Sequence, residues 1–100
     1  MPGFYFPAYD VALLTDPDPD KPPALYANGP INLDLVLTFV PSLEPYDFDL
    51  EAGTPTRRRI FPAIRFDLPG HLSRCWFYED ERSRDAELRA LTNHLVNKGG

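Results

Sequence analysis

Cysteine, histidine and methionine are scarce in this chain of 100 residues, which contains one Cys, two His and one Met. The single Cys75 cannot form an internal disulfide, and one Cys with two His supplies too few ligands for the usual kind of zinc site. Long apolar runs are lacking too: no stretch approaches the roughly 18 residues of a membrane helix, and no signal-peptide pattern opens the chain. We therefore expect a cytoplasmic protein without metal, cofactor or membrane contact.

Catalytic motifs are also lacking. The sequence contains no nucleophile elbow, phosphate-binding loop, dinucleotide fingerprint or zinc-protease motif. Asp16, Asp18 and Asp20 have the opening spacing of a calcium loop, but Lys21 and Ala27 stand where that loop needs glycine and glutamate. The sequence therefore predicts no catalytic residue and no metal site, and it favours a protein that is not an enzyme.

Basic residues are rare in the first half of the chain. Residues 1–56 carry nine acidic side chains and one basic side chain, Lys21, for a net charge of −8, whereas residues 57–100 carry nine basic and six acidic ones, for +3. The first half should repel phosphate. Any electrostatic attraction to nucleic acid would have to come from the second half, above all from Arg57, Arg58 and Arg59.

Apolar and aromatic residues, in contrast, are plentiful. The chain is 43% hydrophobic and 13% aromatic, which is enough apolar surface to offset the conformational entropy lost on folding. A chain of this length builds one core. We predict a single domain over residues 1–100.

The first third of the chain predicts short strands around a proline-rich loop. Residues 4–15 are apolar but contain Pro7, which indicates an edge strand or two short pieces. Four prolines make residues 16–23 an extended loop. The apolar residues 24–27 end at Asn28-Gly29, a dipeptide typical of a hairpin turn, and residues 31–40 alternate as in a strand, with a bulge as the alternative at residues 34–36.

The rest of the chain predicts a long loop, a second hairpin and a helix. Residues 41–56 contain three prolines and four acids, which favours a long acidic loop. Residues 60–68 and 72–78 alternate on either side of Pro69-Gly70, which is typical of a hairpin. Acidic residues 79–81 precede a helical spacing of apolar residues, which predicts a helix over about 80–97.

The fold class expected from these elements is α+β, an antiparallel sheet of four to five strands packed against one C-terminal amphipathic helix. The helix would shield one face of the sheet from water. The candidate core residues are Leu35, Leu37, Ile64, Phe66, Trp76, Leu88 and Leu91.

Two acidic segments and the arginine cluster are the candidate partner-binding residues. The acidic segments combine charge with prolines or aromatic side chains in expected loops, where binding residues concentrate. The arginine cluster is a candidate contact for phosphate or for an acidic partner, with a solvated strand start as the alternative. The candidates are Asp16, Asp18 and Asp20 in the first segment, Tyr46, Asp47, Phe48 and Asp49 in the second, and Arg57, Arg58 and Arg59.

Two stretches resemble small uncharacterised bacterial and phage proteins. Residues 26–36 read YANGPINLDLV, and residues 64–91 read IRFDLPGHLSRCWFYEDERSRDAELRAL. In the similar proteins, a strand of the I-N-L-D-x-V type precedes a hairpin with an aromatic end and a helix that opens with acidic residues. The resemblance implies a compact accessory or interaction protein of unassigned function, with no catalytic residues to carry over.

The leading hypothesis from the sequence is a noncatalytic protein-binding module that acts through its acidic loops and an exposed sheet edge. The aromatic N-terminus could leave that edge open, either for a partner protein or for a homodimer. Nucleic-acid binding through Arg57–Arg59 is the alternative from another class, although the acidic composition argues against it. A third hypothesis is inhibition of a host defence nucleoprotein by acidic mimicry of nucleic acid.

Overall fold

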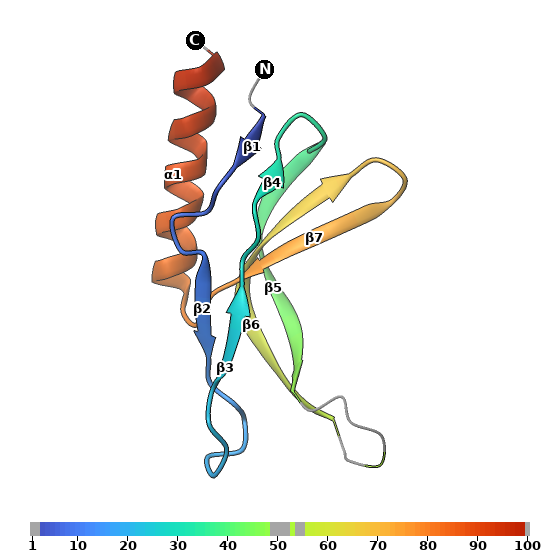
Figure 1. Cartoon of the computed structure of the whole chain (residues 1–100), viewed down its shortest axis with the longest axis vertical. Helices are drawn as coiled ribbons and strands as arrows, with labels where there is room; N and C mark the ends of the chain where they lie inside the picture. Colours follow the sequence, from blue (N-terminus) through green and yellow to red (C-terminus); the bar gives the residue numbers. More distant parts are fainter. Residues whose placement is uncertain (1–2, 49–52, 54–55, 100) are drawn as a thin grey trace.

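The computed structural model describes residues 3–48, 53 and 56–99 and has the expected α+β architecture (Figure 1). Its elements are β1 (Phe4–Tyr5), β2 (Val11–Leu14), β3 (Ala24–Ala27), β4 (Ile31–Asn32), β5 (Thr38–Phe48), β6 (Arg57–Leu68), β7 (Leu72–Phe77) and α1 (Glu81–Gly99). The strands form three small antiparallel sheets, ordered β1-β4, β2-β3 and β5-β6-β7. The fold class is confirmed, but seven strands in three sheets replace the expected single sheet of four to five strands.

The β6–β7 hairpin confirms the alternation of residues 60–68 and 72–78. Leu68 lies opposite Leu72, and Ala63 lies opposite Phe77. The turn between the two strands needs left-handed backbone, which Gly70 supplies with a φ of 80° and His71 with a φ of 60°. β6 is the central strand of the main sheet, with β7 on one side and β5 on the other.

The prediction of a loop over residues 41–56 is wrong for its first half, because β5 extends to Phe48 and pairs along its whole length with β6. The prolines are compatible with a strand because of where they lie. Pro41 and Pro45 are four residues apart, so their nitrogens share one edge, and β5 is the outermost strand of its sheet. A missing N–H on the outer edge breaks no ladder hydrogen bond.

The hairpin predicted at Asn28-Gly29 is also wrong. β3 pairs with the preceding β2 rather than with β4, and β4 pairs with β1. Residues 4–14 and 24–32 therefore form one long, interrupted hairpin, called here the N-terminal hairpin, with the proline-rich loop at its tip (Figure 1). Asn28 is used for something other than a turn: its amide is buried, accepts a hydrogen bond from Phe77 N (2.9 Å), and donates to Phe77 O (3.1 Å) and Tyr9 O (3.0 Å).

The strand predicted over residues 31–40 is interrupted. β4 ends at Asn32, whose side-chain oxygen accepts a hydrogen bond from Asp34 N (3.0 Å) and whose carbonyl accepts one from Leu35 N (3.0 Å). Such an Asx turn competes with the sheet ladder. The turn leaves Leu35 (54%) and Leu37 (70%) exposed, so both were wrong as core candidates. The other candidates are confirmed: Ile64, Phe66, Trp76 and Leu91 are buried, and Leu88 packs against them.

The main sheet supports two hydrophobic cores, one on each face of β6. Because successive side chains of a strand point to opposite faces, Ile64 and Phe66 lie on one face and Phe61 and Ala63 lie on the other. The first core joins Ile64 and Phe66 to Trp76, to α1 and to β1 and β4 through Leu91, Tyr5 and Ile31. The second core joins Phe61 and Ala63 to Phe48, Phe77, and β2 through Ala12 and Leu14.

Helix α1 is fixed at its start and in its middle by carboxylates. Asp80 caps the helix, its Oδ1 accepting a hydrogen bond from Ser83 N (2.8 Å). That bond lowers the pKa of Asp80. Glu87 is fully buried and accepts hydrogen bonds from the backbone N–H groups of Ala8 and Tyr9, both at 3.1 Å, so it ties the N-terminal hairpin to α1. No helix among residues 3–48 and 56–99 is long and apolar enough to cross a membrane.

Replacing Asn28 by alanine should lower the free energy of unfolding by about 3 kcal/mol, since it leaves the buried N–H and C=O of Phe77 and the partly buried C=O of Tyr9 without this partner. Urea denaturation followed by tryptophan fluorescence measures this change. Asn93→Ala is the matched control, because Asn93 is exposed on α1 and alanine is a better helix former. Equal stability of the two variants would show that the Asn28 amide is not the link between hairpin and sheet.

Candidate functional site

A cleft of about 440 Å³ lies between the tip of the N-terminal hairpin and the adjoining ends of β5 and β6. Residues 21–24 line one wall and Tyr46, Asp47 and Phe48 line the other, and the side chains of Asp16 and Arg57 complete the lining. We call this the loop cleft. Five of the ten predicted partner-binding residues line it, although they come from three separate segments of the sequence.

The loop cleft is closed on one side by an ion pair between Asp16 and Arg57. The Arg57 guanidinium donates to both carboxylate oxygens, through Nε to Oδ1 at 2.8 Å and through Nη2 to Oδ2 at 2.7 Å. Asp16 is buried, and this two-point hydrogen bonding lowers its pKa to about 2. The pair connects the hairpin tip to the first residue of β6.

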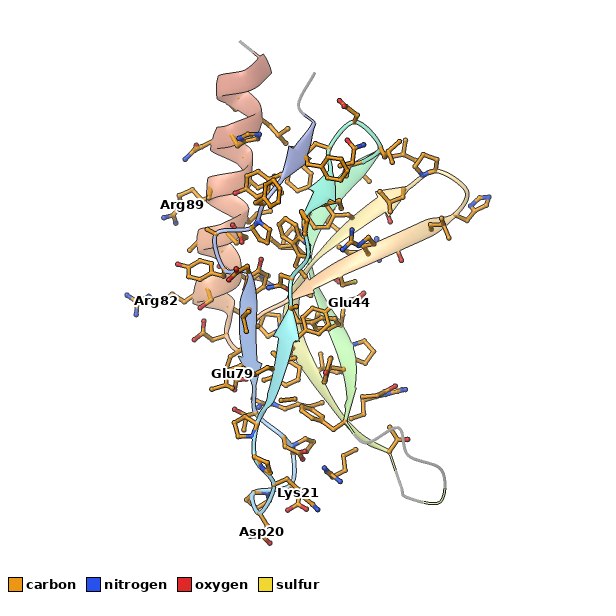
Figure 2. All side chains as sticks on the ribbon, in the orientation of Figure 1. Asp20, Lys21, Glu44, Glu79, Arg82 and Arg89 are labelled. Carbon is orange, nitrogen blue, oxygen red and sulfur yellow. The ribbon has the colours of Figure 1, made fainter. Side chains whose placement is uncertain are left out.

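The other aspartates of the first acidic segment shape the loop rather than gather around a ligand. Asp16 Oδ1 also accepts a hydrogen bond from Asp18 N (2.8 Å), and Asp18 Oδ1 accepts one from Asp20 N (3.0 Å). These are consecutive Asx turns. Asp20 and Lys21 lie at the far tip of the hairpin (Figure 2). No group of His, Cys, Asp or Glu within the described part of the chain could hold a metal ion.

The three consecutive arginines do not form a single basic patch. They alternate along β6, so Arg58 points to the face opposite that of Arg57 and Arg59. Arg58 pairs with Asp47, which lies directly opposite on β5. The guanidinium donates through Nε to Oδ1 at 2.5 Å and through Nη2 to Oδ2 at 3.1 Å. That contact lowers the pKa of Asp47 and raises that of Arg58.

Arg59 is held by a different group of residues. Its Nη1 lies 3.3 Å from Glu79 Oε1 and 3.3 Å from Thr15 O, and its guanidinium lies 4.8 Å from the centre of the Phe61 ring. Glu79 also accepts hydrogen bonds from Thr15 N (2.8 Å) and Thr15 Oγ1 (2.7 Å). Each arginine therefore has its own acidic partner from a different element.

The aromatic members of the predicted site belong mainly to the second core. Tyr46 packs edge-on against Phe48 and Tyr26, with ring centres 5.0 and 5.6 Å apart. Phe48 is buried, so it supports the wall of the loop cleft more than it faces a partner. Asp49, the last predicted site residue, lies outside the described residues. The binding role of all ten residues stays a prediction.

Sequence reasoning missed a second hollow, which lies beside β2. A groove of about 280 Å³ separates β2 from the start of α1, with Tyr9 and residues 11–13 on one side and Tyr78, Glu79 and Ser83 on the other. We call it the β2 groove. The sequence did carry a signal for it: residues 11–14 are all apolar, so a strand that buries only Ala12 and Leu14 must expose Val11 and Leu13.

Comparison with known proteins gives no relative from which a function could be carried over. No protein-family model matches the chain, and no curated protein or solved structure gives a significant match. A function for this chain must therefore be inferred from the chemistry of the surfaces described above.

The Asp16–Arg57 pair predicts a pH-dependent contribution to stability. Because the folded-state pKa of Asp16 is lowered to about 2, the pair stabilises the fold fully above the ordinary carboxyl pKa near 4. This contribution is lost as the pH falls from about 4 to about 2. Asp16→Asn should therefore be less stable than the parent at pH 7, and the two free energies of unfolding should converge toward pH 2.

Urea denaturation between pH 7 and pH 2 measures this difference. Asp20→Asn is the matched control, since the Asp20 carboxylate makes no hydrogen bond or ion pair with any described residue. It should follow the parent over the whole range. If the difference in free energy of unfolding between the parent and Asp16→Asn stayed constant down to pH 2, the assigned role of the pair would be contradicted.

Proposed function

We propose that this chain is a noncatalytic protein-binding module whose docking surface is the outer side of the N-terminal hairpin. The observation that carries the proposal is the exposure of large apolar side chains on this one element. Phe4, Phe6, Val11, Leu13 and Leu25 are each more than half exposed, while the residues that alternate with them are in the cores. Apolar side chains gathered on one element, rather than scattered singly, are typical of an interaction site.

The size of this surface supports a protein partner. Since a whole aromatic side chain presents about 150–250 Å², these five side chains offer on the order of 500 Å². Each partner in a standard protein interface contributes about 800 Å². The hairpin alone thus supplies more than half of the surface area that one partner contributes to a specific complex.

The charge near the hairpin supports a partner with basic residues. Asp10 precedes β2 and is exposed, and Asp18 and Asp20 lie in the loop at the tip, where Lys21 is the one cation of the segment. The loop cleft opens at this same tip and adds aromatic and proline surface. A partner that covers the hairpin would therefore meet an apolar stripe with one acid, Asp10, along its length and two more at the tip.

The pairing of the arginines favours protein binding over the two alternatives from the sequence. A phosphate would have to displace Asp16, Asp47 or Glu79 from its arginine. Mimicry of nucleic acid would require clustered carboxylates without cations, whereas Asp16 and Asp47 are each bonded to an arginine. The distribution of charge on the described surface supports neither alternative.

Site-specific photo-crosslinking tests the docking surface. A photoreactive amino acid at Leu13 or Leu25, used in the cells that carry the protein, should give one discrete adduct that is identical for the two positions, because both side chains lie on the outer face of β2 and β3. Leu72 is the matched control, since it is an equally exposed leucine in β7 and should give no such adduct. Mass spectrometry identifies the adduct. Its absence at both hairpin positions would overturn the proposal.

A titration with labelled single-stranded RNA tests the nucleic-acid alternative. We expect no change in fluorescence anisotropy at low salt, because the three arginines are already paired with acids. The triple variant Arg57→Ala/Arg58→Ala/Arg59→Ala should unfold at lower urea concentration than the parent. Binding by the parent that weakens steeply with salt and is lost in the triple variant would instead establish the alternative.

A further inference from the structure

The outer edge of β2 carries backbone groups without partners. Asn28 N donates to Asp10 O (2.8 Å), which makes this a hydrogen-bonded pair of the β2–β3 ladder. Because such pairs alternate along an antiparallel ladder, the N–H and C=O groups of Val11 and Leu13 point away from β3. The structure records no hydrogen bond to them from any described residue. They form a short template for another strand.

This edge opens into the β2 groove. Residues 11–13 line one side of the groove, and Tyr78, Glu79 and Ser83 line the other. The groove lies where β2 faces the first turns of α1 (Figure 1). The groove therefore combines the unpaired main-chain groups of β2 with the Ser83 hydroxyl, the Glu79 carboxylate and exposed apolar side chains. Sheets that bind an extended peptide as an added strand use main-chain hydrogen bonds and side-chain pockets in this way.

The ends of the edge are already occupied, which limits the length of an added strand. The N–H of Tyr9 donates to Glu87 Oε1 (3.1 Å), and the N–H of Thr15 donates to Glu79 Oε2 (2.8 Å). Only Val11 and Leu13 remain between them. An incoming segment can thus pair over about three residues, at about 3.3 Å of rise per residue.

Acidic side chains lie along the groove. Glu79 lies beside β2 and is paired with Arg59 (3.3 Å), whereas Arg82 and Arg89 extend from the opposite side of α1 (Figure 2). Asp10 precedes the edge, and Glu81 is exposed in the first turn of the helix. A second copy of this chain would bring the same acidic edge and a net charge of −5 toward an identical one. A basic segment would be attracted.

We infer that the β2 edge binds an extended segment of a partner protein in which basic and apolar residues alternate, as a short added strand between β2 and α1. The inference rests on the proposed docking function and names its mode and its partner chemistry. The backbone of Val11 and Leu13 supplies the hydrogen bonds. The apolar side chains of the segment lie over Val11, Leu13 and Leu25, and a basic side chain reaches the exposed carboxylate of Asp10.

A fluorescein-labelled seven-residue peptide that alternates lysine and valine is the probe, with a glutamate–valine peptide as its counterpart. Anisotropy should show binding of the lysine peptide and at least about tenfold weaker binding of the glutamate peptide. Amide hydrogen exchange, followed by NMR with the lysine peptide present, should slow at Val11 and Leu13. Leu13→Pro should weaken binding about tenfold or more, because it removes one outward N–H and obstructs the edge.

Ala27→Pro is the matched control. Ala27 lies opposite Val11, and its N–H points to the other edge of the same hairpin, so its loss should change binding less than about twofold. If Leu13→Pro does not fold, Val11→Pro against the same Ala27→Pro control repeats the comparison.

The inference is overturned if the parent and Leu13→Pro bind the lysine peptide equally, or if the peptide slows amide exchange at residues outside β2 but not at Val11 and Leu13. It is also overturned if light scattering shows a parent dimer that Leu13→Pro converts to a monomer, which would assign the edge to a second copy. If neither peptide binds but Leu13 and Leu25 still give a crosslinked partner, strand addition fails while the docking surface stands. If no adduct forms either, both proposals fail.

Discussion

The structure depends on one strand, β6, which packs against different parts of the molecule along its length. One of its faces is buried near Ile64 and Phe66, and the opposite face is buried near Phe61 and Ala63. Ile64 and Phe66 pack against α1 and one half of the N-terminal hairpin, and Phe61 and Ala63 pack against the other half. A twisted sheet presents different faces along its length, so one long strand can serve two cores. The hairpin passes from one core to the other at Asn28, where hydrogen bonds to Phe77 join it to the end of β7.

This arrangement explains which parts of the fold could be predicted from the sequence. The β6–β7 hairpin and the helix follow from local patterns, namely alternation, a Pro-Gly turn and an acidic start. β5 was missed because prolines and acids are typical of loops, and only its place at the edge of the sheet makes Pro41 and Pro45 acceptable. Asn28-Gly29 was misread because its role depends on Phe77, 49 residues away.

The geometry of the candidate site could likewise not be predicted from local sequence patterns. The sequence indicated that Asp16 and Arg57 belong to charged segments, but 41 residues separate them, and nothing local indicates that they form a pair. Reading Arg57, Arg58 and Arg59 as one basic cluster overlooked the alternation of a strand, which sends them to different faces and different acids. The β2 groove depends on which of four apolar residues the second core buries, and this is a property of the whole fold.

The prolines on the outer edge of β5 bear on how this chain behaves at high concentration. A protein with two open strand edges can join end to end and grow into fibres. Here Pro41 and Pro45 remove two donors from the β5 edge, so that a strand from a neighbouring molecule would find no continuous ladder there. Growth into fibres through the outer edge of β5 is therefore disfavoured.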